Sequence, residues 1–211
     1  MLSDRISAMK LKVILPLLMS LLSVASAVET TAKTEEAVIG GGCFWCTEGC
    51  YQIVPGVLKV TSGYAGGHVE NPTYEQICTK TTGHAEVIKI EYDPAKVSFK
   101  DLVDLFWFVH DPTTYHRQGA DEGPQYRSII LYANDAQKQA AEQSKKEHEK
   151  EFTAPITTEV VPLTKFYVAE KYHQNFANNN PNQGYVCAVV KPKVEKFKHK
   201  LAEIAKRAEG K

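Results

Sequence analysis

Residues 40–46 read GGGCFWC, so a glycine-rich loop runs directly into two thiols and two aromatic side chains. This pattern predicts that Cys43 stands at the start of a helix, where amide groups without internal partners carry partial positive charge. A thiol in that position is expected to be favoured as the thiolate, the nucleophilic form of cysteine. Phe44 and Trp45 beside it indicate an apolar reaction pocket.

The spacing of Cys43 and Cys46 leaves other interpretations open. Two thiols three residues apart after a strand are typical of thiol–disulfide oxidoreductases, which exchange them with a disulfide. A non-enzymatic alternative is a secreted binding domain whose cysteines form structural cross-links. The same spacing can begin a zinc site, but no second pair follows and the 7 histidines are scattered. We therefore expect no metal.

Residues 1–27 have the layout of a secretory signal peptide. Basic residues precede an apolar run over residues 13–24, and small residues suited to cleavage end at Ala27. The run is too short for a comfortable membrane span, so we expect cleavage and no stable membrane association afterwards. The mature chain would begin near Val28 and be exported, to the periplasm in a Gram-negative bacterium and otherwise to the medium.

The mature chain is long enough for one domain with a substantial core but short for two. We expect a leader over residues 28–37 and a single domain over residues 38–211. The 25 basic and 25 acidic residues balance, and no basic block is interleaved with aromatics, so a nucleic-acid partner is not expected. Five cysteines are an odd number for an exported chain and leave at least one thiol unpaired.

Strand and helix patterns alternate along this domain, which predicts an α/β or α+β fold. The glycine-containing stretch 63–83 is predicted as a loop, and Ser98 and Asn134 are suited to cap helices. The predicted strands are residues 37–41, 57–62, 85–92, 126–133 and 157–161. The predicted helices are residues 43–54, 98–109, 134–151 and 194–206.

Six short motifs occur in order along the chain: GCFW at 42–45, GYAGG at 63–67, NPTY at 71–74, GHAEV at 83–87, HDPTT at 110–114 and QYRS at 125–128. Together they closely resemble peptide methionine-S-sulfoxide reductase, the A-type enzyme. The resemblance runs from about Val38 to about Phe197. It implies a two-layer α/β sandwich with a ferredoxin-like core and extensive coil, and reduction of methionine S-sulfoxide for repair of oxidised proteins, free methionine sulfoxide being a further possible substrate.

The matched motifs supply the groups that this chemistry needs. Cys43 would attack the sulfoxide sulfur, and the oxygen must take up a proton as its bond to sulfur breaks. A neutral carboxylic acid with a raised pKa is a suitable donor, and Glu86 in the GHAEV motif is the candidate. By the resemblance, Tyr74 and Tyr126 hold the sulfoxide oxygen with their hydroxyls, where they would stabilise developing charge.

The resemblance also implies a substrate slot that accepts the S epimer. Phe44 and Trp45 would enclose the substrate methyl group, and Asp121 would support the polar side. No bound cofactor is expected, and the electrons would come from an external thioredoxin-like dithiol. The partners are therefore oxidised proteins or peptides and this reductant, and we expect a monomer.

Attack leaves Cys43 as a sulfenic acid, which a second thiol must condense with before over-oxidation. Cys46 lies one helical turn away. Cys187 lies in a segment resembling the family's tail with its resolving cysteine, although Val186 displaces it by one position. Cys187 is favoured because a mobile tail can reach a buried sulfenic acid, whereas a helical Cys-x-x-Cys must unwind to form a disulfide. A relay through both is an alternative.

The remaining cysteines, Cys50 and Cys78, are expected to be small, inert core residues, which is the usual role of a buried cysteine.

Overall fold

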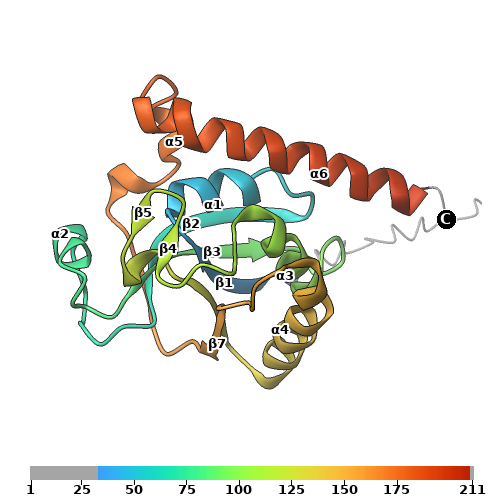
Figure 1. The fold of residues 1–211 in the computed structure, drawn as a ribbon, viewed down its shortest axis with the longest axis horizontal. Coiled ribbons are helices and arrows are strands. Elements are labelled where there is room, and N and C mark those ends of the chain that lie inside the picture. Colours follow the sequence, from blue (N-terminus) through green and yellow to red (C-terminus); the bar gives the residue numbers. More distant parts are fainter. Residues whose placement is uncertain (1–32, 210–211) are drawn as a thin grey trace, which may run out of the picture. The chain divides into compact units, whose positions relative to one another are not determined.

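The computed structural model describes residues 33–209, so the predicted signal peptide and the first part of the predicted leader lie outside the described residues. A six-stranded mixed sheet and a separate two-stranded ribbon, together with the helices, form one α/β domain (Figure 1). This confirms the predicted class. The strands are β1 (Glu35–Gly41), β2 (Val57–Ala65), β3 (Ala85–Tyr92), β4 (Arg117–Gln118), β5 (Asp121–Glu122), β6 (Ser128–Tyr132), β7 (Glu159–Pro162) and β8 (Phe166–Val168). The α-helices are α1 (Phe44–Tyr51), α2 (Tyr74–Cys78), α3 (Phe99–Val109), α4 (Asp135–His148), α5 (Phe176–Asn179) and α6 (Lys191–Glu209).

The large sheet has the strand order β7-β6-β1-β3-β2-β8. Strand β1 is antiparallel to both of its neighbours, pairing Ile39 with Ile88 of β3 and with Ile130 of β6. Strand β2 is antiparallel to β3 and to β8, whereas β7 joins β6 in parallel. The central position of β1 places its last residues, and the loop that follows them, among neighbouring strands.

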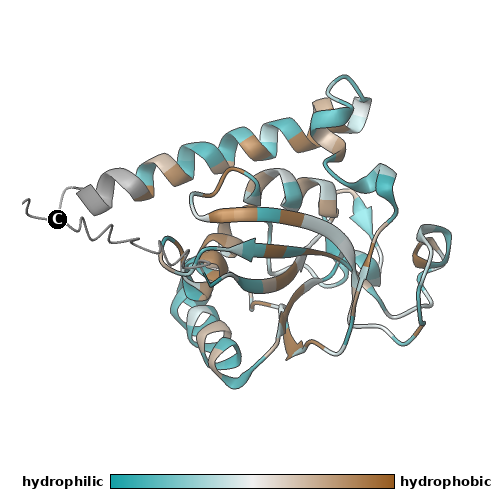
Figure 2. Ribbon diagram, turned by 180° about the vertical axis from the view of Figure 1, so that it is seen from behind, coloured by the Kyte–Doolittle hydropathy of each residue, from teal (hydrophilic) through white to brown (hydrophobic). Residues whose placement is uncertain are grey.

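The two faces of the sheet bury different side chains, because successive residues of a strand point to opposite faces. Ile39, Ile88 and Ile130 belong to the main hydrophobic cluster, which also contains the buried residues of α1 and α3. The alternate positions, including Val38 and Val87, belong to a second cluster. Figure 2 shows hydrophobic residues on the strands and mostly hydrophilic residues along α4 and α6.

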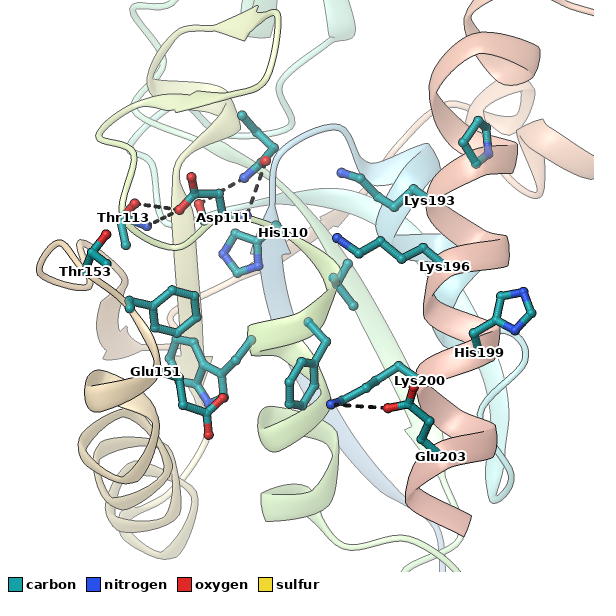
Figure 3. A pocket seen from close by; sticks show the side chains of 16 residues that line it. His110, Asp111, Thr113, Glu151, Thr153, Lys193, Lys196, His199, Lys200 and Glu203 are labelled. Atoms are coloured by element: carbon teal, nitrogen blue, oxygen red, sulfur yellow. Dashed lines mark hydrogen bonds and ion pairs between the residues drawn. The ribbon is translucent and has the colours of Figure 1, made fainter. Parts of the chain in front are cut away.

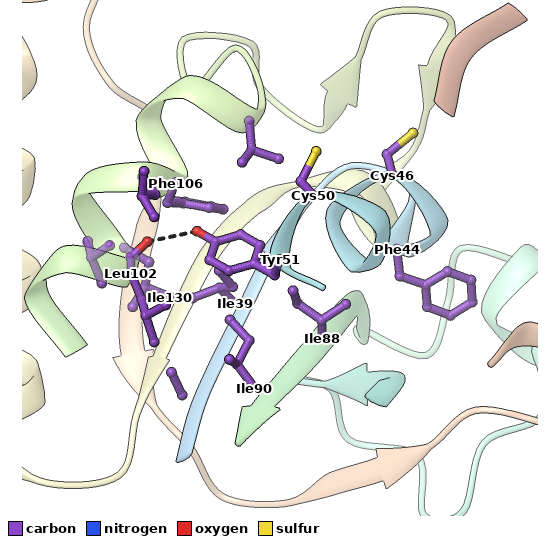
Figure 4. Close-up of a cluster of buried hydrophobic side chains, with 14 of the residues drawn as sticks. Ile39, Phe44, Cys46, Cys50, Tyr51, Ile88, Ile90, Leu102, Phe106 and Ile130 are labelled. Carbon is purple, nitrogen blue, oxygen red and sulfur yellow. Dashed lines mark hydrogen bonds between the residues drawn. The ribbon is translucent and has the colours of Figure 1, made fainter. Parts of the chain in front are cut away.

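Helix α1 is fixed to α3 through the main cluster. Tyr51, which is fully buried at the end of α1, donates its hydroxyl hydrogen to the carbonyl oxygen of Leu102 at 2.7 Å (Figure 4). Helix α3 begins as predicted, because the Ser98 side chain accepts the amide of Asp101 and the Asp101 side chain accepts the amide of Ser98. These contacts fix the position of α1, and with it the start of the helix, relative to α3.

Several predicted boundaries are wrong. The stretch 63–83 is not all loop, because β2 continues to Ala65 and α2 forms over Tyr74–Cys78 with a capping box from Thr73. Helix α1 ends at Tyr51, and Tyr126 closes a 3₁₀ turn over Pro124–Tyr126 before β6 begins. Turn chemistry and tertiary contacts set these ends more than hydrophobic periodicity does. The strand predicted over residues 157–161 corresponds to β7, whereas the two- and three-residue strands β4, β5 and β8 are too short to show a reliable period.

The C-terminal helix begins earlier than predicted. A π-helical turn over Val186–Val190 leads directly into α6, which lies beside α1 (Figure 1). Phe197 is buried as expected from the helical pattern, but Ile204, predicted to face inward, is 39% exposed. In the part of the chain that the structure describes, no helix is both long and apolar enough to cross a membrane.

Candidate active site

Cys43 lies where β1 gives way to α1, as the N-cap residue of that helix. The loop before it requires glycine: Gly42 has φ +96°, and a Cβ there would lie 2.6 Å from the Gln118 side chain. A Cβ on Gly40 would lie 2.6 Å from the carbonyl oxygen of Glu86. The absence of these side chains therefore allows the cysteine loop to approach strand β3 closely.

Glu86 reaches the start of α1 from β3. Its Oε2 accepts the backbone N–H of Phe44, the first residue of the helix, at 3.1 Å, and its side chain is 2% exposed. This amide is one of those left without a partner inside the helix, so the carboxyl group satisfies it. The contact places the predicted acid beside the predicted nucleophile, although the two are 43 positions apart in the sequence.

The environment of Glu86 suits a proton donor. Burial raises its pKa to about 8, the charges of Asp121 and Cys46 add to this rise, and the Phe44 amide opposes it. A large fraction of the Glu86 carboxyl groups is therefore protonated near neutral pH, as donation to an oxygen atom requires.

The surroundings of Cys43 in the reduced, unliganded protein act against the predicted thiolate. A hydrogen bond with the Cys46 thiol, burial and the charge of Glu86 all raise the pKa of Cys43 above its usual value, and they outweigh the backbone amide of Trp45. The same hydrogen bond, with smaller contributions from Lys193 and Tyr185, lowers the pKa of Cys46 to about 7 despite burial. One thiol of this pair is thus favoured for ionisation at the expense of the other, because the two share a hydrogen bond.

Tyr74 and Tyr126 are brought together with Glu86 by two short helical segments. Tyr74 opens α2, and its backbone N–H donates to Glu170 Oε1 at 2.8 Å. Burial, followed by the charge of Glu86, raises the pKa of both phenols well above the ordinary value. Both tyrosines therefore keep their hydroxyl hydrogens and remain hydrogen-bond donors.

Aromatic rings form a wall beside the nucleophile. Trp45 donates its indole N–H to Nδ1 of His173 at 3.2 Å and stacks on Phe176, with ring centroids 3.7 Å apart. The His173 ring also lies 4.9 Å from Phe44 and 4.5 Å from Tyr74. Phe44 and Trp45 were expected here, whereas His173 and Phe176 were missed. His173 ends a short 3₁₀ turn and Phe176 begins the four-residue helix α5, and segments this short show no period.

Asp121 is half-buried in the small ribbon, where its Oδ2 accepts the hydroxyl hydrogen of Tyr185 at 2.7 Å. Tyr185 was not predicted as a site residue, although it lies two positions before Cys187. Its ring packs edge-on against Trp45 with centroids 6.0 Å apart. Asp121 thus holds an additional phenol against the same aromatic wall.

The other cysteines lie in different environments. Cys46 and Cys50 are buried on α1, whereas Cys78 and Cys187 are exposed. The prediction of a buried Cys78 is wrong, because α2 is a surface helix in which only Ile77 is buried. Cys187 lies in the π-helical turn, with its thiol 3.3 Å from the carbonyl oxygen of Pro181. It is therefore part of a helix, not of the mobile tail that was expected.

Comparisons with known proteins agree with this arrangement. Residues 35–205 match the family model described as peptide methionine sulfoxide reductase. The chain is similar to peptide methionine sulfoxide reductase MsrA 1 of Rhodopirellula baltica, with 49% identity over 83% of this chain and 92% of that protein.

Two solved structures are similar in fold. Methionine sulfoxide reductase A of Corynebacterium diphtheriae is 38% identical with a TM-score of 0.69, covering 71% of this chain and 76% of that chain. Mxr1 from Saccharomyces cerevisiae in complex with Trx2 is 26% identical with a TM-score of 0.50, covering 70% and 87%.

Proposed function

The chain belongs to the peptide methionine sulfoxide reductase family, and from this premise we propose how its own residues carry out the reaction. The protein is a peptide-methionine (S)-S-oxide reductase, which reduces methionine sulfoxide in proteins. The observation that carries the proposed mechanism is the contact between the buried Glu86 carboxyl group and the Phe44 amide, one residue from Cys43.

In the first step Cys43 attacks the sulfoxide sulfur, and the protonated Glu86 donates to the oxygen. The oxygen passes to Cys43 as a sulfenic acid, the sulfur–oxygen bond of the substrate breaks, and methionine is released. Tyr74 and Tyr126 donate to the same oxygen while its negative charge develops. Protonation of Glu86 also removes its negative charge from beside Cys43 and so favours the thiolate.

The aromatic wall of Phe44 and Trp45 receives the methyl group of the substrate. Phe44 is buried and Trp45 is held by its bond to His173, so the slot is preformed. Asp121 acts through Tyr185, which it orients toward Trp45. A slot with an apolar side and a hydroxyl-bearing side distinguishes the two epimers. In the R epimer the positions of the methyl group and the oxygen are exchanged, so the methyl group would face the hydroxyls and the oxygen would face the apolar wall.

Cys46 is proposed as the first thiol to resolve the sulfenic acid, ahead of Cys187. Its thiol already contacts that of Cys43, and the lowered pKa favours its thiolate. The expected obstacle of helix unwinding is smaller here, because Cys43 is the N-cap with ψ 125° and so stands outside the helical backbone. Cys187 then attacks the Cys46 sulfur of this disulfide, which frees Cys43 and transfers the disulfide to Cys46 and Cys187, an exposed residue. This exchange is the second stage of the relay.

The proposed reductant is a thioredoxin-like dithiol, with no bound cofactor. The yeast relative in complex with Trx2 supports this choice. Reduction converts the Cys46–Cys187 disulfide that the relay leaves to two thiols while the dithiol becomes a disulfide, so the electrons balance.

Export is also proposed, with cleavage after Ala27 and a domain beginning near Val38 that functions as a monomer. The basic, apolar and small-residue order of residues 1–27 supports it. Mass spectrometry of the protein purified from cell fractions would identify the first residue. An intact Met1 in the cytoplasmic fraction would overturn export.

A ferredoxin-like core is the proposed finer description of the fold. The order β1-α1-β2-β3-α3-β6, with β6-β1-β3-β2 adjacent in the sheet, supports this description. The strands β7 and β8 are then additions at the two edges.

The mechanism is tested with separated S and R epimers of a methionine sulfoxide peptide, dithiothreitol, and residues 28–211. The S epimer alone should be reduced, and Cys43→Ser should abolish turnover. Cys78→Ser is the matched control, because that thiol is exposed on α2. Turnover by Cys43→Ser would overturn the proposed nucleophile, and disulfide exchange without sulfoxide reduction would favour the thiol–disulfide oxidoreductase alternative.

Mass spectrometry of the disulfides after one turnover without reductant tests the order of resolution. The first disulfide should join Cys43 to Cys46. A Cys43–Cys187 disulfide that forms at the same rate in Cys46→Ser would reverse the proposed order.

A further inference from the structure

The hydroxyl-bearing side of the substrate slot includes a residue on a weakly packed helix. Helix α2, which begins with Tyr74, has five residues, and only Ile77 among them is buried. The capping box satisfies the backbone amides of Thr73 and Gln76, but it leaves that of Tyr74 unpaired. A helix this short has little packing of its own to fix its first residue, so contacts from other segments must do so.

The groove between α3 and α6 does not supply these contacts. It has a volume of about 970 Å³, and His110 is among its lining residues (Figure 3). A Cβ on Gly41 would lie 3.0 Å from the His110 ring, so the groove reaches the loop before the nucleophile. Its lining does not include Tyr74, Glu86 or Tyr126. The groove therefore does not position the hydroxyl-bearing side of the slot.

Glu170, which lies between β8 and the 3₁₀ turn Lys171–His173, supplies the contact that α2 needs. Its Oε1 accepts the backbone N–H of Tyr74 at 2.8 Å, and its Oε2 accepts the hydroxyl hydrogen of Tyr64 at 2.8 Å. The two partners are 96 and 106 positions away in the sequence. One carboxylate thus joins the first residue of α2 to a residue of the central sheet.

Tyr64 gives this carboxylate a rigid partner. It is fully buried in β2, and it lies opposite Glu86 in the register of β2 and β3. Its ring centroid is also 5.9 Å from that of Phe44, the first residue of α1. The sheet therefore fixes Tyr64 relative to the proposed proton donor, and the shared carboxylate fixes the start of α2 relative to Tyr64.

The charge state of Glu170 suits this double contact. Burial acts to raise its pKa, but hydrogen bonds, including those from the Tyr74 amide and the Tyr64 hydroxyl, outweigh burial and lower the pKa below the ordinary value. An ionised carboxylate can accept both bonds at once, because it has two acceptor oxygens. His173 is not a third partner, since its Nε2 lies 3.8 Å from Oε2 of Glu170, which is too long for a hydrogen bond.

We propose that Glu170 is a positioning residue that holds Tyr74 where its hydroxyl donates to the sulfoxide oxygen. The inference deepens the proposed function and rests on it. The His173 ring contacts both sides of the slot, with its centroid 4.5 Å from that of Tyr74 and 4.9 Å from that of Phe44. The phenol is thus beside the slot, and the bond to its backbone N–H limits the directions that it can take. A displaced hydroxyl would stabilise the developing charge less well and slow the first step.

The test measures methionine release in a single turnover with saturating S-sulfoxide peptide and no reductant, so disulfide exchange does not limit the rate. Glu170→Met removes both acceptor oxygens but keeps a side chain of similar length, and it should slow release about tenfold. Glu170→Gln should keep most of the rate, because its oxygen can accept the Tyr74 N–H while its NH₂ group donates to the Tyr64 oxygen. Glu70→Met is the matched control and should leave the rate unchanged, since that side chain is 79% exposed.

A Tyr74→Phe background separates positioning from a structural role. Tyr74→Phe alone should slow release about 10- to 100-fold, because it removes the hydroxyl donor. It keeps the backbone N–H and with it the bond to Glu170. In that background Glu170→Met should change the rate by no more than about twofold, since no hydroxyl is left to misplace. The melting temperature should fall equally in both backgrounds, because the same bond to the backbone is lost.

Tyr64→Phe is a milder perturbation that keeps Glu170 in place. It removes only the hydrogen bond from the sheet, so release should slow about threefold, and only when Tyr74 is present. Equal slowing with and without the Tyr74 hydroxyl would contradict the inference.

Three results would decide against the proposal. Undiminished slowing by Glu170→Met in the Tyr74→Phe background would overturn the inference, because the effect would then not pass through the hydroxyl. Equal slowing by Glu170→Gln and Glu170→Met would also overturn it, because the charge and not the acceptor oxygen would then be responsible. An unchanged rate in Tyr74→Phe alone would instead overturn the proposed role of Tyr74, and this inference with it.

Discussion

Two carboxyl groups near the start of the protein's first helix, Glu86 and Glu48, are equally buried at 2% exposure but have different surroundings. Glu86, on β3, accepts the Phe44 amide at 3.1 Å. Glu48, on α1, accepts the Asn175 amide at 2.8 Å and that of Phe176. The first carboxyl group faces the nucleophile, whereas the second ties α1 to the segment that carries Phe176.

This difference shows that burial alone does not make a carboxyl group a suitable proton donor near neutral pH. Burial raises the pKa of both groups. For Glu86 the negative charges of Asp121 and Cys46 add to the rise, and the pKa reaches about 8. For Glu48 the two backbone amides favour the charged form and oppose the rise. Glu86 is thus suited to donate a proton and Glu48 to accept hydrogen bonds.

Replacement of Glu86 by Gln is the largest expected perturbation. The amide cannot donate a proton as an acid does, so kcat should fall about 100- to 10,000-fold while the fold is kept. Steady-state rates with the S epimer and circular dichroism measure these two properties. A rate within tenfold of that of the unaltered protein would contradict the role of Glu86 as the proton donor, which is what distinguishes it from Glu48.

The pH profile of activity should separate the same groups. Deprotonation of Glu86 removes the proton donor, so kcat/KM should fall about tenfold per unit as pH rises above about 8. Glu48→Gln should retain this falling limb, and Glu86→Gln should lack it. Persistence of the limb in Glu86→Gln would assign it to another group.

The contribution of Glu86 to stability should change with pH in the opposite direction from that of an ordinary salt-bridged carboxylate. Its pKa is raised in the folded state, so the folded state holds the proton more tightly and stability is lost as pH rises from about 4.5 to about 8. The stability of Glu86→Gln relative to the unaltered protein should therefore increase by about 3–4 kcal/mol between pH 5 and pH 8. Urea unfolding at both pH values measures the difference. A gap that does not widen with pH would contradict the raised pKa.

Glu48→Gln is expected to have the smallest effect. It weakens the hydrogen bonds to Asn175 and Phe176, so the free energy of unfolding should fall by about 1–2 kcal/mol. KM should rise more than kcat falls, because Phe176 stacks on Trp45. Glu142→Gln is a suitable control, since that side chain is 55% exposed on α4. A loss of kcat comparable to that of Glu86→Gln would place Glu48 in the chemistry.

Local patterns were sufficient for the elements with strong local signals. The glycine loop predicted Cys43 at the start of a helix, and the apolar spacing after Ser98 predicted α3 with its buried residues and cap. Periodicity failed for α2 and for the short strands β4, β5 and β8, whose few residues are stabilised by contacts with distant segments. It also placed Ile204 inward, although no neighbour covers it sufficiently.

The sequence by itself determined the family, the reaction, and the candidates Cys43 and Glu86, because residue types and motif order are properties of the chain alone. Only the tertiary structure decided the state of those groups. The pKa values of Cys43, Cys46 and Glu86 depend on burial and on charges from β3, β5 and α6, which folding brings together. Folding also brought His173 and Tyr185 to the site, and their spacing along the chain carries no signal of that proximity.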